Sequence, residues 1–346
     1  MAGLRQPFSR WLAIGAAALL LAACSQMGRQ QPAVFGGKFS AGGKYYAYIY
    51  QSVFIFSYQR TGGRTISNGT STHYLQLVDA ETGRKLLAKP LKPIDFDCRH
   101  PDVGDVSNTH VLVACSDDAG KPQAPMVFSI AAQTVSFTSR AIRERNPGLP
   151  VDAVHVYDFY RSDEDPGAFF VEGKDGRKYR LDPQTGAAQV AAGKFWRPDA
   201  DDQLDGQLTQ GLSEAGDGRR YIKQGQWAEL QRSQEDFLAP KYLHLDRGDH
   251  ESFARATLHD GGILVLSRTE KDSGQHKRLT LVDAATLTSR WSTALPQDHG
   301  DWANDFDNER FVLQGDQLLV ANSSQLLRID LATGKIVRNT SLLESP

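Results

Sequence analysis

A recurring turn constrains the fold of this chain more than any other feature of its sequence. An Asp followed three residues later by a Thr occurs at Asp79 (DAETG), Asp182 (DPQTG), Asp283 (DAATL) and Asp330 (DLATG). The gaps are 103, 101 and 47 residues, and the first two are about twice the third. We therefore expect two hidden units. One runs from Met126, with Ala131 in the Asp position and Thr134 retained, and the other lies near residue 232 by spacing alone. Repeats of this length point to stacked supersecondary units.

The last unit shows the internal layout most clearly. Four short runs of strand-like residues are separated by Gly, Ser or Asp: Phe311–Gln314, Gln317–Asn322, Gln325–Asp330 and Lys335–Ser341. The preceding unit and the one that begins near Ala153 repeat this order, and no apolar pattern of helical spacing persists over three turns. Four-stranded units of about 50 residues predict an all-β protein, a β-propeller of about six blades. Seven blades remain the alternative, if the long first unit or the weak unit near residue 232 conceals another sheet.

The turn itself has a structural explanation. An Asp side chain accepts hydrogen bonds from backbone N–H groups that follow it, and Thr does so more weakly. The Gly readily adopts the positive φ that the tight turn requires before the next strand runs back in the opposite direction. Because these Asp residues recur at one position of different units, we interpret them as structural and not catalytic.

One unit carries a family signature. In LVDAATLTSRW, the residues Asp283, Thr286 and Trp291 match the quinoprotein-type (PQQ-like) propeller repeat, while Leu287 replaces its Gly. The other units have Leu87, Val190 and Arg338 in place of the Trp. A lipidated, periplasm-facing propeller of this repeat type is similar to the propeller lipoprotein of the outer-membrane β-barrel assembly machinery, although that family has eight blades. Quinone-dependent dehydrogenases of this repeat type carry adjacent cysteines. This chain has no Cys-Cys pair, so no quinone cofactor is expected.

The N-terminus indicates export. Arg5 and Arg10 precede an uncharged segment, residues 11–23, of signal-peptide length. The segment ends in Leu21-Ala22-Ala23-Cys24, which resembles the bacterial lipoprotein signal. That resemblance implies cleavage before Cys24, acylation of its thiol (including palmitate), and anchoring to a membrane. Ser25 favours the periplasmic side of the outer membrane. An ordinary signal peptide with a coincidental Cys is the alternative. Residues 24–33 are expected to form a polar tether, and residues 34–346 a single propeller domain.

Charge and cysteine content restrict the partners. Without residues 1–23 the chain has 37 basic and 41 acidic residues, a balance of −4, with both signs spread along the chain and no basic stripe. Nucleic acid is therefore excluded as an expected partner. Cys98 and Cys115 end neighbouring strand-like runs and predict a disulfide in an oxidising compartment, with two buried thiols as the alternative. Two cysteines alone do not complete a zinc site.

One loop has the composition of a binding site. The segment Pro296–Arg310 (PQDHGDWANDFDNER) contains an aromatic residue, an imidazole and many carboxylates: Asp298, His299, Asp301, Trp302, Asp305, Asp307 and Glu309. Its position predicts a crossover from the outer strand of one sheet to the first strand of the next. A solvated crossover, a partner contact centred on Trp302 and a weak calcium site all fit this composition, although no EF-hand spacing occurs.

No linear catalytic motif of a hydrolase, a P-loop enzyme or a dinucleotide-binding enzyme is present. We therefore expect a non-catalytic, protein-binding propeller lipoprotein of the cell envelope, with an envelope protein as its partner. One alternative is a hydrolase or lyase with a metal site at the central funnel, where several His, Asp or Glu side chains would converge. The other is a protective or inhibitory envelope lipoprotein.

Overall fold

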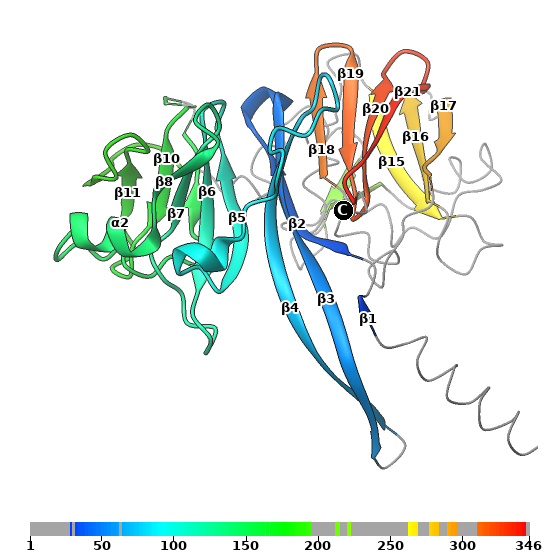
Figure 1. The fold of residues 1–346 in the computed structure, drawn as a ribbon. Helices are drawn as coiled ribbons and strands as arrows, with labels where there is room; N and C mark the ends of the chain where they lie inside the picture. Colours follow the sequence, from blue (N-terminus) through cyan, green and yellow to red (C-terminus); the bar gives the residue numbers. More distant parts are fainter. Residues whose placement is uncertain are drawn as a thin grey trace, which may run out of the picture. The chain divides into compact units, whose positions relative to one another are not determined.

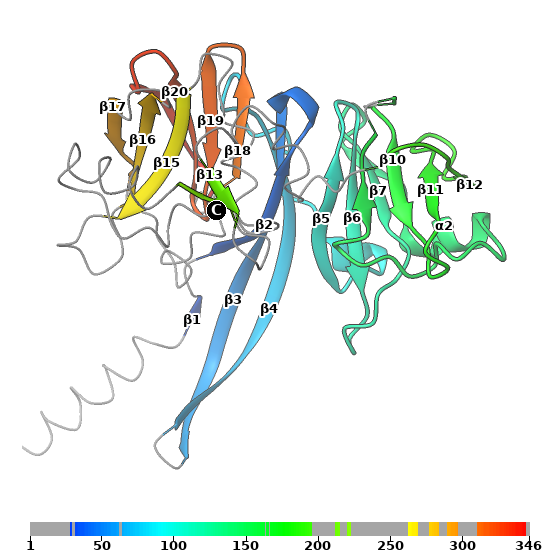
Figure 2. The same cartoon turned by 180° about the vertical axis from the view of Figure 1, so that it is seen from behind.

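The structure is a computed structural model. It describes residues 28–29, 32–61, 64–162, 164–165, 167–195, 212–214, 220–222, 262–268, 277–283, 289–296 and 310–343. The chain forms two compact units. The hairpin unit comprises Met1–Pro32 and Gln51–Thr72, and the sheet unit comprises Ala33–Tyr50 and His73–Pro346. Figure 1 shows the strands of both, and Figure 2 shows them from behind.

The C-terminal sheet is a four-stranded antiparallel meander in chain order. Its strands are β18 (Arg310–Gln314), β19 (Gln317–Ala321), β20 (Gln325–Asp330) and β21 (Ile336–Ser341). Gly315, with φ 61°, makes the first turn, and the Asn322 side chain closes the second by accepting from the backbone N–H groups of Ser324 and Gln325. The four strands expected from the sequence are confirmed.

Two further sheets have the same layout. The first contains β5 (His100–Val106), β6 (His110–Ser116), β7 (Met126–Ser129) and β8 (Thr134–Phe137). The second contains β9 (Phe159–Tyr160), β10 (Phe169–Glu172), β11 (Lys178–Leu181) and β12 (Ala188–Val190). A short helix, α2 (Ser139–Arg145), follows β8, and its N-terminus is capped by the Thr138 side chain. The sequence pattern gave no sign of this helix because its seven residues span only two turns.

Two sheets are described in part. One contains β15 (Gly262–Arg268), β16 (Lys277–Asp283) and β17 (Ser289–Ala294), and the other β13 (Leu212–Glu214) and β14 (Arg220–Ile222). The weak unit expected near residue 232 lies outside the described residues.

The first sheet differs from the expected unit. It contains β1 (Gly28–Arg29), β2 (Ala33–Phe39), β3 (Tyr45–Thr61) and β4 (Arg64–Asp79), in the order β1-β3-β2 with β4 paired to β3. Two 3-10 turns, η1 (Ala41–Gly43) and η2 (Pro93–Phe96), flank it. In place of an outer strand after Asp79, only the single bridges Val78↔Lys85 and Leu75↔Leu91 form. The 17 and 16 residues of β3 and β4 exceed the usual strand length, and the sequence did not predict them.

The D-x-x-T-G turns are structural, as expected. The carboxylates of Asp79, Asp182 and Asp330 accept from both the backbone N–H and the hydroxyl of the Thr three residues on; the hydroxyl distances are 2.8, 2.8 and 2.6 Å. The Gly that follows has φ 70–71° in all three turns. The fourth turn, after Asp283, lies outside the described residues.

The hidden unit near Met126 exists, but the expected alignment is wrong by two residues. Ser129, and not Ala131, ends β7 and accepts from the N–H of Ala132 at 3.3 Å. Gln133 then has φ 53° at the position that Gly occupies in the other turns. A hydroxyl thus replaces the carboxylate, and a non-glycine residue adopts the left-handed conformation.

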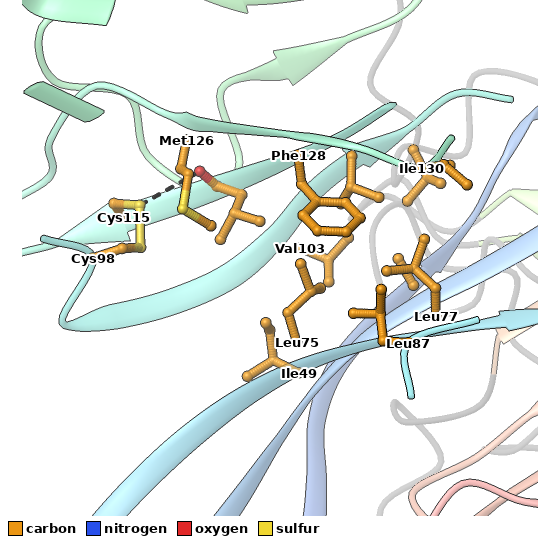
Figure 3. Close-up of a cluster of buried hydrophobic side chains, with 14 residues drawn as sticks. Ile49, Leu75, Leu77, Leu87, Cys98, Val103, Cys115, Met126, Phe128 and Ile130 are labelled. Carbon is orange, nitrogen blue, oxygen red and sulfur yellow. Dashed lines mark hydrogen bonds between the residues drawn. A yellow bond between two sulfur atoms is a disulfide. The ribbon is translucent and has the colours of Figure 1, made fainter. Parts of the chain in front are cut away.

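Neighbouring sheets pack through buried side chains in chain order. Figure 3 shows one cluster, in which Ile49, Leu75 and Leu77 of the first sheet contact Val103 and Phe128 of the second. A second cluster joins the β5–β8 sheet to the β9–β12 sheet. A third joins the first sheet to the last, because Tyr46 and Tyr48 of β3 pack in one cluster with Leu319 and Leu326 of the last sheet and with Leu342, which follows β21.

Three polar contacts reinforce the junction between the first and last sheets. The Tyr48 hydroxyl donates to the carbonyl of Leu342 at 2.8 Å, and Lys85 Nζ donates to the same carbonyl at 3.1 Å. The N–H of Val34 donates to the carbonyl of Ser323 at 3.2 Å. Packing the last sheet against the first is the arrangement of a propeller ring. The all-β class and the four-stranded units are confirmed, and the number of blades stays a prediction.

Candidate functional site

The predicted binding loop joins two sheets that are fixed to each other. Its candidate residues, Asp298, His299, Asp301, Trp302, Asp305 and Asp307, lie outside the described residues, and so does any calcium site they would form. The ends of the loop are described. Leu295, directly after β17, is 5% exposed, and Arg310 begins β18. The loop therefore runs from the last strand of one sheet to the first strand of the next, as the sequence predicted.

Trp291 holds these two sheets together. Its indole Nε1–H donates to the carbonyl of Leu331 at 2.7 Å, and its ring lies against Gly334, where an added Cβ would meet ring atoms at 2.5 Å. The hydroxyl of Thr293 donates to the Gly334 carbonyl at 2.5 Å. Trp291 thus packs on the D-x-x-T-G turn of the following sheet, and Gly334 in that turn leaves space for its ring. Both ends of the 296–310 loop are consequently attached to a rigid support.

A buried ion pair connects three sheets. The side chains of Arg161 and Asp105 are 9% and 4% exposed, with Arg161 Nη2 2.5 Å from Asp105 Oδ1. Arg161 also donates to the carbonyls of Phe39 at 3.1 Å and Val106 at 3.3 Å. Buried charges are tolerated when they are paired and hydrogen-bonded in this way. The pair therefore has a structural role, and 56 residues of separation hid it from sequence analysis.

A bulge in β5 orients the Asp105 side chain toward Arg161. The register of β5 shifts between Val103 and Asp105, so the strand bulges at Gly104. The ring of Phe159 lies over this glycine, where an added Cβ would meet it at 2.3 Å. Bulges redirect side chains in this way. The Gly is needed here because two sheets approach each other closely.

A charged hollow of about 450 Å³ lies beside the helix α2. Carboxylates and guanidinium groups line it together: Asp97, Arg99, Asp117, Asp118, Arg140, Arg143 and Glu144. Arg140 and Glu144 are 2.7 Å apart, and Arg99 and Asp118 are 3.8 Å apart. The hydrogen bond from Arg140 lowers the pKa of Glu144. Four carboxylates and three guanidinium groups line the hollow together, so their charges largely cancel and the hollow has no strong preference for an anion or a cation.

Two histidines, His73 and His110, have lowered pKa values. Burial lowers the pKa of His110, an effect partly opposed by Asp182, and His110 Nδ1 lies 3.0 Å from the Thr109 hydroxyl. Burial, and then the neighbouring His100, lower the pKa of His73. Within the described ranges, no three His, Cys, Asp or Glu side chains come together as metal ligands.

The expected disulfide is present. Cys98 and Cys115 are bonded, with their Cα atoms 5.0 Å apart, and both residues are buried in the cluster of Figure 3. The bond links the segment before β5 to strand β6, and both of its cysteines belong to this core cluster. Of the residues described, none belongs to a helix long and apolar enough to cross a bilayer.

The hairpin unit carries a surface that sequence analysis missed. Phe54 and Phe56 of β3 are 50% and 55% exposed, and alternate residues of a strand share one face. The expectation that charges of both signs are spread along the chain is wrong for this region, because the first acidic residue of the chain is Asp79. A count of charges by segment would have revealed this asymmetry.

Comparisons with known proteins identify no family. No protein-family model and no curated protein matches this sequence. Among solved structures, TolB from Acinetobacter baumannii is similar at 12% identity over 89% of this chain and 54% of TolB, with a TM-score of 0.26. A puromycin-hydrolyzing peptidase of Mycobacterium tuberculosis is 12% identical over 90% of this chain and 39% of the peptidase, with a TM-score of 0.27.

The WD40 domain of SCAP from fission yeast is 12% identical over 91% of this chain and 57% of that structure's chain, with a TM-score of 0.22. This chain thus spans between two fifths and three fifths of the lengths of these three structures. With scores this low, the fold assignment depends on the sheets described above.

Proposed function

We propose that the protein is a lipid-anchored scaffold of the cell envelope, a propeller of the PQQ-like repeat type that binds another envelope protein. Acylation of Cys24 would hold it on the periplasmic side of the outer membrane, in the manner of the propeller lipoprotein of the β-barrel assembly machinery. The lipoprotein-like sequence Leu21-Ala22-Ala23-Cys24 supports the anchor. The Cys98–Cys115 bond supports an oxidising compartment.

One observation carries the binding role. The loop with the densest mixture of Trp, His and carboxylates starts and ends on two sheets that Trp291 fastens together. Binding residues are commonly placed on loops that a rigid scaffold positions. A Trp near the centre of an interface often contributes more than about 2 kcal/mol. We therefore assign partner binding to Asp298, His299, Asp301, Trp302, Asp305 and Asp307.

The anchor and the loop have separate tests. Cys24→Ala should move the protein from the membrane fraction to the soluble periplasm, and unchanged fractionation would contradict acylation. Trp302→Ala with Asp305→Ala should weaken capture of the partner from crosslinked envelopes, while anchoring and folding stay intact. Asp152→Ala, a substitution in the exposed Lys174–Asp152 pair, is the matched control. Metal-dependent turnover of a substrate by the purified protein would replace the scaffold proposal with a funnel enzyme.

A further inference from the structure

The hairpin unit lies close, along the chain, to the proposed anchor. Gly28 and Arg29 form β1 and pair with Ile55 and Phe54 of β3. Gly28 is the fourth residue after Cys24, and four extended steps of the chain span at most about 14 Å. The acyl chains on Cys24 would therefore hold the part of the hairpin around Phe54 near the membrane surface, because β1 is fixed to it.

The exposed side chains of this strand are the kind that enter a bilayer interface. Phe54 and Phe56 lie on one face of β3 and are each about half exposed. The other large apolar side chains exposed among the described residues are Ile94, Tyr157, Val190 and Val337. Val190 and Val337 are each the only one on their strand, and Ile94 and Tyr157 lie outside strands. Paired aromatic residues left in water mark an interaction surface, and burial of each ring is favourable.

The charge of the hairpin unit indicates the chemistry of the surface that it would contact. From Cys24 onward, the hairpin unit contains Arg29, Arg60 and Arg64, and it contains no Asp or Glu. The rest of the chain supplies all 41 acidic residues. Basic residues near an anionic lipid surface are attracted to it. Exposed aromatic side chains in a unit whose sequence contains Arg and no acidic residue match a surface of anionic phospholipid.

We propose that the β3–β4 hairpin is a membrane-contacting arm, with Phe54 and Phe56 inserted among the headgroups of an anionic leaflet. The position of the arm relative to the bilayer depends on the proposed acylation of Cys24, but its affinity for lipid does not. A contact between the arm and the membrane would add to the anchoring that the acyl chains on Cys24 provide.

The first experiment removes the acyl chains and tests the hairpin directly. The Cys24→Ala protein without residues 1–23 is sedimented with vesicles of phosphatidylethanolamine and phosphatidylglycerol, and with vesicles of phosphatidylcholine alone. Binding should require the anionic lipid and weaken as salt is raised. Phe54→Ser with Phe56→Ser should reduce the partition coefficient by about tenfold. Val190→Ser with Val337→Ser, two exposed apolar residues of other strands, should leave it unchanged. Equal binding by both double variants, or no binding by the parent, would overturn the proposal.

The second experiment reports the environment of the arm. In the Cys24→Ala protein, Phe56→Cys provides a single free thiol, since Cys98 and Cys115 are bonded and buried. An environment-sensitive dye at this position should shift its emission to the blue when anionic vesicles are added. An unshifted spectrum in the presence of bound vesicles would overturn the proposal.

Failure of the arm and failure of the anchor are distinguishable. If Cys24 carries acyl chains in the native protein but a photocrosslinker in place of Phe56 labels a protein instead of lipid, the anchor stands and the membrane role of the arm is wrong. If Cys24 carries no acyl chain and the dye still shifts, the arm stands and the lipoprotein proposal is wrong.

Discussion

Single residues in this protein fall into two classes, those that recur and those that occur once. Asp79, Asp182 and Asp330 make the same turn in three sheets, so each stabilises only its own hairpin. Asp105 and Arg161 occur once, and their hydrogen bonds connect three sheets. The first class is visible in the sequence because it repeats. Loss of the second should cost far more stability.

Asp105→Ala should lower the free energy of unfolding by about 3 kcal/mol, because it leaves the buried guanidinium of Arg161 without its counter-charge. Urea unfolding measures this change. Asp152→Ala, in an ion pair whose side chains are 53% and 41% exposed, should cost at most about 1 kcal/mol. Equal effects of the two substitutions would show that the buried pair is not a structural junction.

The turn carboxylates predict a pH dependence. Hydrogen bonds from the Gln184 N–H and the Thr185 hydroxyl lower the pKa of Asp182, and those from the Thr333 hydroxyl and N–H lower the pKa of Asp330. A carboxyl whose pKa is lower in the folded state stabilises that state fully above its unfolded pKa, about 3.9. This contribution is lost as the pH falls through the folded pKa.

Asp182→Asn combined with Asp330→Asn should therefore destabilise the protein at neutral pH, and the deficit should shrink below about pH 4. Chemical unfolding of the variant and the parent across this range measures it. A deficit that is independent of pH would mean that the charge of the carboxylates does not matter.

At the scale of elements, the sequence predicts the strands whose turns carry strong local signals. The strands β18 to β21 follow because Gly315, Asn322 and Asp330 mark each reversal. Ser129 is harder to align, because its hydroxyl performs the role of a carboxylate. The long hairpin could not be predicted, since Ser, Thr, Gln and Gly in residues 57–72 suit a loop as well as a strand. The Trp291 contact is likewise invisible without the neighbouring sheet.

The disulfide should stabilise the second sheet measurably. It closes a loop of 17 residues, for which the chain-entropy model gives about 3 kcal/mol. Cys98→Ala with Cys115→Ala should reduce the free energy of unfolding by about this amount. Thermal unfolding of the variant, compared with the parent with and without reductant, tests it. If reduction leaves the parent's midpoint unchanged, the bond contributes no stability.

At the scale of the whole sheet unit, the contacts define an order of sheets. The β9–β12 sheet packs on β5–β8, that sheet on the first, the first on β18–β21, and β18–β21 contacts β15–β17 through Trp291. The sheets therefore follow one another in chain order, and the last sheet is the neighbour of the first. In a ring of six sheets, the segment 196–261 supplies the one sheet between β9–β12 and β15–β17.

Closure of that ring makes a prediction about distances. Spin labels at Val190→Cys in β12, Ala294→Cys in β17 and Val337→Cys in β21 each occupy the last strand of a sheet, at exposed positions. In a closed ring of six, the sheets of residues 190 and 294 are separated by one sheet, whereas those of residues 190 and 337 lie opposite each other. The 190–294 distance should therefore be the shorter one. Pulsed electron paramagnetic resonance on the two doubly labelled Cys24→Ala proteins measures both. A longer 190–294 distance would show that the five contacting sheets form an open arc, and the propeller ring would be wrong.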